Sequence, residues 1–377
     1  MALAQVEVQA GEPKQARAAN LGIVYATAQY GSDFSTLAQL LRERTGIDQW
    51  VGAIGHGICA SGVEYVDEPA LAILLAELPA GSFRLFSGRQ PLPGVLQGDR
   101  DGGFAAHTAL VHADPSTPDL MELVKDMAER IATGYLFGAV VSGELDQPPQ
   151  LAHEVVAGGL SGALIDDQVR LLSRVTQGCA PLVGEHVISD CSSHYIKSLD
   201  GMPALDVMLE DLGVAQTVRQ SRDGNEILRA LPMERLRRGL LVGLAPTRSD
   251  RQVGFGDYLV RNLIGIDPQN RLIAVAARPE RGARAVFCTR DQRAARGDLI
   301  RICSELRDEV ESEQLTVKGG LYFSCVGRGQ HLFGSQGAEL ELIRHNLGDL
   351  PLIGMYANGE IAGNQIYGYT GVLTLFV

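Results

Sequence analysis

A repeated order of short segments constrains the fold of this chain more than any single residue does. Near the C-terminus, the sequence predicts a buried strand from Leu321 to Val326, then a glycine-rich loop, a helix from Ala338 to Leu347 and a second strand from Leu352 to Tyr356. The strands are short apolar runs with β-branched or aromatic residues, whereas the helix places its leucine and isoleucine residues at helical spacing. The second strand ends in a turn that contains Gly359.

The same order occurs near the start of the chain. Leu21 to Thr27 predicts a strand, Ser35 to Arg44 a helix, and Trp50 to Ile54 a second strand that leads into another glycine turn. A third strand of this type, Tyr135 to Val141, also ends in a Gly-Glu pair. We therefore predict an α/β fold of mixed α+β character, with two related halves, large mixed β-sheets covered by helices, and an internal pseudo-duplication.

Length and pattern together predict the domain organisation. At 377 residues, the chain is too long for one ordinary core. We expect a flexible lead-in over residues 1–18, a domain over 19–215 and a second domain over 216–377, because the apolar pattern lapses between Gly213 and Asp223. We also predict a short helix from Ala70 to Glu77.

Charge and cysteine content exclude several classes of function. The formal net charge of −12 argues against a broad nucleic-acid surface, which needs clustered Lys and Arg. The six cysteines form no CxxC pair and have no histidine partner at zinc-finger spacing, so we expect reduced thiols and no metal site. The sequence shows no signal peptide and no run of roughly 18 apolar residues, so we expect a cytoplasmic protein without membrane insertion.

The common catalytic and cofactor signatures are missing. The chain has no GxGxxG loop, no phosphate-binding GKS or GKT, no HExxH and no GxSxG elbow. This removes the commonest named enzymes and leaves an unfamiliar one open; our first hypothesis is a binding module with no cofactor and no catalytic residues.

Several motifs in combination resemble one family. They are YLFGAVVSGE, TQGCAPLVGEHVIS and IKSLDGMPALDVM in the first half, and LYFSCVGRG, LFG and LIGMYANGEIAG in the second half. Together they resemble the FIST sensory domain family, N-terminal domain followed by C-terminal domain, over about residues 20–376. The resemblance implies an intracellular sensory module for signal transduction. It also implies a small ligand, such as an amino acid or a related carboxylate, and a signalling partner protein on another chain.

The expected ligand site lies where the glycine-rich strand ends of both halves meet. Arg328 is the leading candidate, because a guanidinium in a glycine-rich loop can hold a carboxylate with two hydrogen bonds. Glu360 and Asn358 could recognise an amino group. The remaining candidate ligand-binding residues are Gly327, Gly329, Cys179, Gly143, Glu144 and His56.

Each candidate also has a structural interpretation. Arg328 could form a salt bridge with Glu360 or Glu144, and Glu360 could cap backbone amides of a loop. Two other functions stay open from the sequence. One is a cysteine-dependent hydrolase or amidase, with Cys179 or Cys325 as nucleophile and His186, His194 or His331 as base. The other is an adaptor that docks partner proteins.

Overall fold

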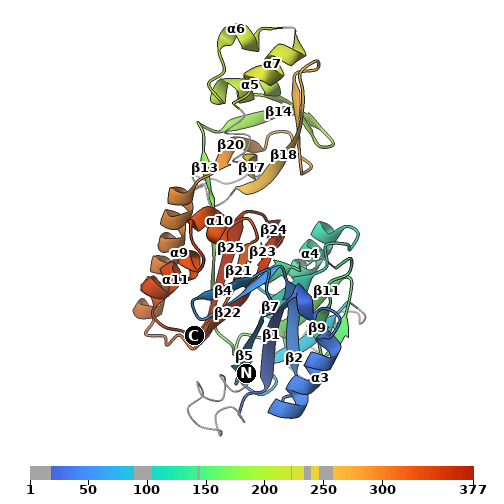
Figure 1. Cartoon of the computed structure of the whole chain (residues 1–377), viewed down its shortest axis with the longest axis vertical. Helices are drawn as coiled ribbons and strands as arrows, with labels where there is room; N and C mark the ends of the chain where they lie inside the picture. The colour runs from blue at the N-terminus through green and yellow to red at the C-terminus, as the bar shows by residue number, and fades with distance from the viewer. Residues whose placement is uncertain (1–17, 89–103, 142–144, 222, 233–238, 246–257) are drawn as a thin grey trace. The chain divides into compact units, whose positions relative to one another are not determined.

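The computed structural model describes residues 18–88, 104–141, 145–221, 223–232, 239–245 and 258–377 (Figure 1). The chain divides into two compact units: the first combines the segment up to Thr176 with Arg296–Val377, and the second is Gln177–Ala295. This division differs from successive domains, because strands near the C-terminus pair with strands from the first half of the chain. The limits of 19–215 and 216–377 stay a prediction, whereas the mixed α+β class is confirmed.

Three β-sheets make up the described part of the first unit. The first has the order β10-β9-β2-β1-β5, from β1 (Leu21–Thr27), β2 (Trp50–Gly55), β5 (Leu71–Ala76), β9 (Gln150–Ala152) and β10 (Glu154–Val156). The second has the order β24-β23-β8-β7-β11-β6, from β6 (Phe83–Ser87), β7 (Thr108–Ala113), β8 (Tyr135–Val140), β11 (Leu160–Ile165), β23 (Glu360–Gly363) and β24 (Gln365–Tyr367). The third has the order β12-β25-β21-β22-β3-β4, from β3 (Gly57–Ala60), β4 (Val63–Val66), β12 (Leu171–Gln177), β21 (Gly319–Cys325), β22 (Leu352–Ala357) and β25 (Thr370–Phe376).

These sheets are three copies of one arrangement. Each contains two parallel strands joined through helix: β1 and β2 through α3 (Phe34–Thr45), β7 and β8 through α4 (Leu120–Glu129), and β21 and β22 through α10 (Gly329–Phe333) and α11 (Ala338–Leu347). The leading strand of each pair also has an antiparallel neighbour: β5, β11 and β25 respectively. The pseudo-duplication inferred from the sequence is therefore part of a threefold repeat.

The three copies are connected in a cycle. After the second parallel strand, the chain leaves its own sheet and forms a hairpin at the edge of another. The hairpin β3-β4 extends the third sheet beside β22, β23-β24 extends the second beside β8, and β9-β10 extends the first beside β2. Each sheet is thus completed by chain from a neighbouring copy, and the three copies fold as one unit.

A glycine stands at the same place in the second parallel strand of every copy. Gly52, Gly138 and Gly354 lie beside Val24, Val111 and Tyr322 in the register. A Cβ on any of them would lie within 1.9 Å of the carbonyl oxygen of that partner. The parallel strands therefore approach each other too closely here for any side chain.

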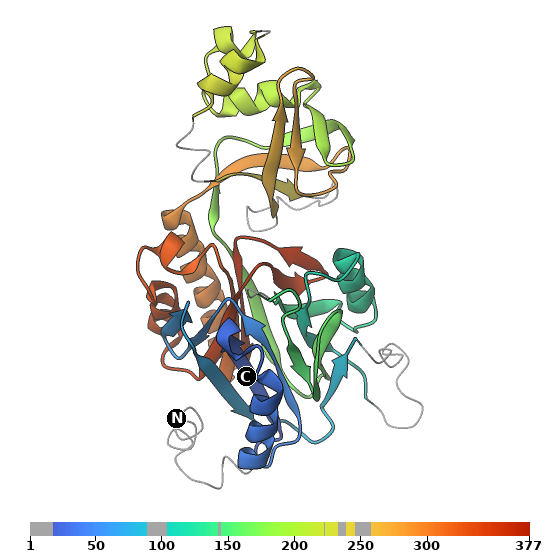
Figure 2. The ribbon, with the colours of Figure 1, turned by 45° about the vertical axis from the view of Figure 1, so that its right-hand side comes forward.

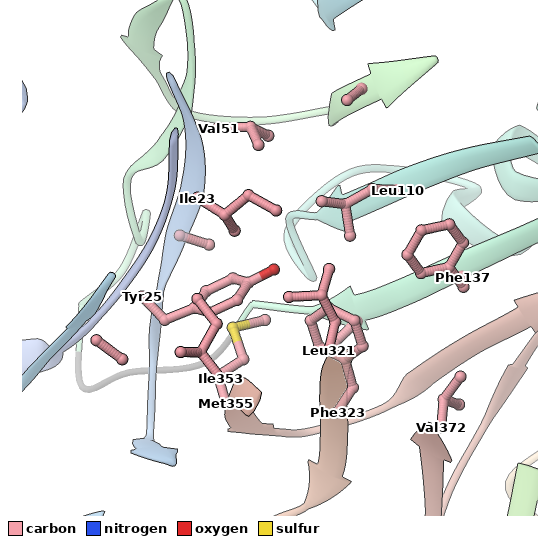
Figure 3. Close-up of a cluster of buried hydrophobic side chains, with 14 of the residues drawn as sticks. Ile23, Tyr25, Val51, Leu110, Phe137, Leu321, Phe323, Ile353, Met355 and Val372 are labelled. Carbon is pink, nitrogen blue, oxygen red and sulfur yellow. The ribbon is translucent and has the colours of Figure 1, made fainter. Parts of the chain in front are cut away.

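The inner faces of the three sheets share one core. Val24, Val111 and Tyr322 each lie between two residues that point into this core. The preceding residue is apolar (Ile23, Leu110 and Leu321), and the following residue is aromatic (Tyr25, His112 and Phe323). Side chains from all three sheets point toward one another in this core (Figure 3). The three rings contact edge to face, with centroids 5.4, 5.7 and 6.5 Å apart. Alternation along each leading strand thus directs every second residue into the shared core.

One polar contact lies within this core. Tyr25 Oη and His112 Nε2 are 3.0 Å apart, and both side chains are fully buried. Burial lowers the pKa of His112 to about 3. The imidazole is therefore neutral at physiological pH, which suits its place among apolar side chains.

The outer faces of the sheets carry the helices, which lie at the periphery of the unit (Figures 1 and 2). Phe34, Ala38 and Leu41 of α3 pack on the first sheet, and Val124, Met127 and Ala128 of α4 pack on the second. The long helix α9 (Gln292–Ser312) pairs through Glu305 and Glu309 with Arg174 of β12. None of the helices in the described ranges combines the length and the hydrophobicity that a membrane span requires.

The predicted helix at Ala70–Glu77 is wrong. This segment forms strand β5, which pairs with β1 in antiparallel register from Leu71 to Ala76. Leucine and alanine favour helix locally, but β1 offers a complete set of backbone hydrogen-bond partners, and pairing with it overrides that preference.

The described part of the second unit contains one sheet, the helices α5, α6 and α7, and the start of α9. The strand order β20-β14-β15-β19-β18-β17 returns to β20, because β17 and β20 also pair. Its elements are β13 (Cys179–Pro181), β14 (His186–Ser192), β15 (Tyr195–Leu199), β16 (Met202–Pro203), α5 (Ala204–Asp211), α6 (Gln216–Arg219), α7 (Gly224–Ala230), β17 (Leu240–Ala245), β18 (Leu259–Asp267), β19 (Leu272–Val275) and β20 (Arg284–Arg290). Its apolar core combines α5 with the inner face of this sheet.

Candidate functional site

The third copy of the repeat departs from the other two on the face that carries its helices. In the first two sheets, the outward residues on either side of the inward aromatic are apolar (Val24, Ala26, Val111 and Ala113). In β21 the same positions hold Tyr322 and Ser324, and both side chains are buried. The layer between sheet and helix is therefore polar here.

Glu339 lies at the centre of this polar layer. It stands in the first turn of α11, is fully buried, and accepts hydrogen bonds on both carboxylate oxygens. The donors are Tyr322 Oη at 2.6 Å, Arg328 Nε at 2.7 Å, Ser324 Oγ at 3.0 Å and the Gly329 amide at 3.3 Å. Four donors therefore satisfy both oxygens of this buried carboxylate.

Arg328 is the cation of this layer and the leading candidate from the sequence. It lies between β21 and α10, and its side chain has no exposed area. The ion pair that it forms is with Glu339, so the expected pairing with Glu360 is wrong; Glu144 lies outside the described residues. Burial lowers the pKa of Arg328, but Glu339 and the other acidic groups raise it more, so the guanidinium stays charged.

Two nitrogens of this guanidinium have no partner in the part of the chain that the structure describes. Only Nε contacts Glu339, and within the described part of the chain neither Nη1 nor Nη2 has a hydrogen-bond partner. The ring of Phe333 lies 5.2 Å from the guanidinium carbon and covers one of its faces. Buried donors without partners are costly, and two parallel N–H groups match a carboxylate.

Glu360 is a second buried group with an unused atom. It begins β23 and is fully buried; Oε2 accepts from Thr370 Oγ1 at 2.6 Å and from the Thr370 amide at 3.3 Å. The predicted capping interaction with backbone is therefore present. Oε1 has no partner among the described residues. Burial raises the pKa of Glu360 to about 8, although Thr370 and Arg328 oppose the shift.

The raised pKa of Glu360 predicts a pH dependence of stability. A carboxyl group whose pKa is higher in the folded state contributes most stability below its ordinary pKa of 4.5 and loses that contribution as the pH rises toward 8. We expect the free energy of unfolding of the wild-type protein to fall more steeply between pH 5 and pH 8 than that of Glu360→Gln. Urea titrations at both pH values measure the difference. Equal slopes for the two proteins would show that Glu360 titrates normally.

Glu64 joins this region from the first copy of the repeat. It lies on β4, is 2% exposed, and accepts from the Gly337 amide at 2.7 Å and from Tyr356 Oη. Its backbone carbonyl accepts from Gln336 Nε2 at 2.9 Å. The hairpin β3-β4 therefore fixes the loop that precedes α11.

The remaining residues predicted for the site are dispersed. Gly329 is buried and donates to Glu339, Gly327 is half-buried, and Asn358 is exposed. His56 has an exposed side chain, and its amide donates to the Tyr356 carbonyl at 3.1 Å. Cys179 is buried in the second unit, whereas Arg328 is in the first. Gly143 and Glu144 lie outside the described residues.

The groups required by a cysteine hydrolase do not form a visible dyad. Burial and the nearby Glu360 raise the pKa of Cys325 to about 12, so its thiol is protonated and unreactive at neutral pH. His331 is exposed on α10. His186 and His194 lie in the second unit; His186 contacts Asp200 and Asp211, and His194 Nδ1 lies 2.8 Å from the Ala277 carbonyl oxygen.

Sequence reasoning missed the acidic half of the site. Glu339, Glu64, Tyr322 and Tyr356 were not predicted as site residues. One signal was available for Tyr322 and Ser324, because they alternate along a strand predicted to be buried and so share one face. Glu64 carries no local signal, since its partners lie about 270 residues away in the sequence. The described residues contain no group of His, Cys, Asp and Glu side chains suited to a metal ion.

Two models of one protein family together match almost the whole chain. The model of the FIST N domain matches residues 20–202, and the model of the FIST C domain matches residues 204–363. An uncharacterized protein of Mycobacterium tuberculosis is 30% identical over 390 residues, which cover 97% of this chain and 97% of that protein. An uncharacterized protein of Mycobacterium bovis is 30% identical over 339 residues, which cover 87% of this chain and 82% of that protein.

Proposed function

Because this chain belongs to the FIST family of sensory domains, we propose that its first unit binds a small carboxylate ligand at Arg328, with α-amino acids as the preferred class. The ligand carboxylate would accept from Nη1 and Nη2, the two donors that Glu339 leaves free. Ligand binding, rather than catalysis, is the proposed role of this site. The signal would pass to a partner protein on another chain, and a cytoplasmic location stays a prediction.

The observation that carries this proposal is the contrast between the copies of the repeat. The first two copies fill the space between sheet and helix with apolar side chains, which is sufficient for stability. The third holds a buried Arg-Glu pair in that space, and such a pair generally stabilises no more than apolar residues of similar size. A buried guanidinium whose Nη1 and Nη2 have no partner among the described residues is therefore better explained by recognition than by folding.

Glu360 supports an amino acid over a simple carboxylate. Its Oε1, which has no partner among the described residues, is a buried oxygen that could accept from a ligand ammonium group, and that cation would favour the ionised carboxylate. A zwitterion brings a positive and a negative charge together, so it adds no net charge to a region that already contains Glu64, Glu339 and Glu360. A small ligand is required, because Arg328 and Glu360 are almost completely buried.

Thermal-shift titration with the twenty amino acids and their deaminated analogues tests the proposal. A ligand at 100 times its Kd should stabilise the protein by about 2.7 kcal/mol, a shift of several degrees in Tm. We expect Arg328→Lys to remove the shift, because lysine keeps a charge for Glu339 but lacks the two parallel donors.

Arg328→Ala is unsuitable for this test, because it would leave Glu339 unpaired and destabilise the apo protein. Arg344→Lys on α11 is a suitable control, since the Arg344 side chain is 55% exposed and its ion pairs with Glu341 and Asp349 are both 3.9 Å long. Unchanged affinity in Arg328→Lys would remove Arg328 from the site.

A further inference from the structure

We infer that Glu64 is a positioning residue that holds the loop 327–337 closed over Arg328, and that release of this loop admits the ligand. The inference deepens the proposed function, since it names the step that controls access to that site. It begins from a geometric fact: Arg328, Glu339 and Glu360 have 0–1% exposure. A ligand can reach the guanidinium only after some covering segment moves.

Among the described residues, the part of the loop 327–337 that packs against the Arg328 side chain is α10, through Phe333. This helix is five residues long, and it exposes Gln330 and His331 while it buries Leu332 and Phe333. The inward side of α10 includes the Phe333 ring, which lies against the guanidinium. A single helical turn has little stability of its own, so α10 depends on contacts at its ends.

Glycines bound this loop on both sides. Gly329, Gly334 and Gly337 have φ values of +49°, +91° and +75°, a region that other residues adopt with difficulty. Such positions allow the backbone to change direction on either side of α10. The following helix, α11, packs through Leu340 and Ile343 and provides a fixed end.

Glu64 holds the C-terminal end of the loop and lies close to Gly329 near its other end. Oε1 accepts from the Gly337 amide at 2.7 Å, and Oε2 lies 3.3 Å from the position that a Cβ on Gly329 would occupy. Tyr356 Oη donates to Oε2 and fixes the carboxylate from β22. Within the described part of the chain, Glu64 contacts Gln336, Gly337 and Tyr356 rather than Arg328, so its role is to position the cover rather than to bind the ligand.

Hydrogen exchange in the protein without ligand tests the inference, and it does so whether or not a ligand is ever found. Glu64→Gln replaces one of the two acceptor oxygens of the side chain by an NH2 group, so it cannot accept from both the Gly337 amide and Tyr356 Oη. We expect the backbone amides of residues 327–337 to exchange about tenfold faster in this variant than in wild type. Amides of α11 and of β1 should keep their wild-type rates. Glu68→Gln is the matched control, because Glu68 is an exposed glutamate shortly after β4. This variant should keep the wild-type exchange rates.

Two results would overturn the inference. One is an unchanged exchange rate for residues 327–337 in Glu64→Gln, which would show that Glu64 does not restrain the loop. The other is a uniform increase across the first unit, which would make Glu64 a general stabilising residue. If an amino acid binds, stopped-flow measurements should also show that it associates faster with Glu64→Gln than with wild type. The contacts of the ligand with Arg328 should be the same in both proteins. If no ligand binds, the proposed function fails, but the exchange result stands by itself.

Discussion

Replacement of Glu339 by alanine is expected to lower the free energy of unfolding of the first unit by about 3–5 kcal/mol, because it leaves a fully buried guanidinium without its counter-charge. The variant also removes the acceptor for Tyr322, Ser324 and the Gly329 amide. Urea denaturation followed by circular dichroism measures the change. A loss of this size would place the substitution among the most destabilising single changes.

A neighbouring residue provides the control. Glu341 lies two positions further along α11, its side chain is 72% exposed, and its ion pair with Arg344 is 3.9 Å long. Glu341→Ala should change the stability by no more than about 0.5 kcal/mol. A similarly small effect for Glu339→Ala would mean that Arg328 finds another partner easily, and the description of a tightly organised polar layer would be wrong.

Substitution of Gly354 by alanine is the second change with a large expected effect. The added Cβ would lie 1.7 Å from the Tyr322 carbonyl oxygen and 2.6 Å from its carbon, both of which are backbone atoms of the adjacent strand. Separation of β21 from β22 would disturb the shared core and the polar layer together. We expect a loss of at least about 4 kcal/mol, or failure to accumulate as folded protein.

Gly297 offers the opposite case. It lies inside α9, and a Cβ there would have no neighbouring atom within 4 Å. Gly297→Ala should therefore stabilise the protein by about 0.5–1 kcal/mol, since alanine favours helix over glycine. If Gly354→Ala were tolerated as well as Gly297→Ala, the parallel strands of the repeat would be more adaptable than their register indicates.

The local elements of the fold were largely predictable from the sequence. The expected strand at Leu21–Thr27 and the expected helix at Ala338–Leu347 have the observed limits. Both depend on contiguous residues, whose apolar spacing and flanking glycines act locally. The helix predicted over this part of the chain was wrong because the conformation of residues 71–76 is not determined locally. These residues form a strand that depends on pairing with β1, which lies about 50 residues earlier.

The threefold arrangement was only partly predictable. The first and third copies show clear strand-helix-strand order, and the end of β8 was noticed as similar. The exchange of hairpins between sheets has no sequence signal, because β3, β9 and β23 pair with strands distant in the chain. The glycines of the repeat are visible in the sequence, but their common role becomes clear only from the register.

The candidate site shows the same limit. Arg328 and Glu360 were predicted as ligand contacts because a cation in a glycine-rich loop and an acid at a strand end suggest recognition, and that role stays a proposal. Whether Arg328 pairs with Glu360 or Glu339 depends on the direction of α11 relative to β21, which the sequence does not determine. Glu339 is separated from Arg328 by the whole loop, and helix propensity alone gives a first-turn glutamate no special role.

The most direct test of the proposed function is nitrogen NMR of the protein labelled with ¹⁵N-arginine, recorded during titration with the amino acid that gives the largest thermal shift. The titration observes the Arg328 side chain in the wild-type protein, and a variant is needed only to assign its signals. If the ligand carboxylate binds at Nη1 and Nη2, the Arg328 guanidinium signals, assigned with Arg328→Lys, should shift in proportion to the bound fraction. Saturation of the thermal shift with unchanged Arg328 signals would contradict the account and place the ligand elsewhere.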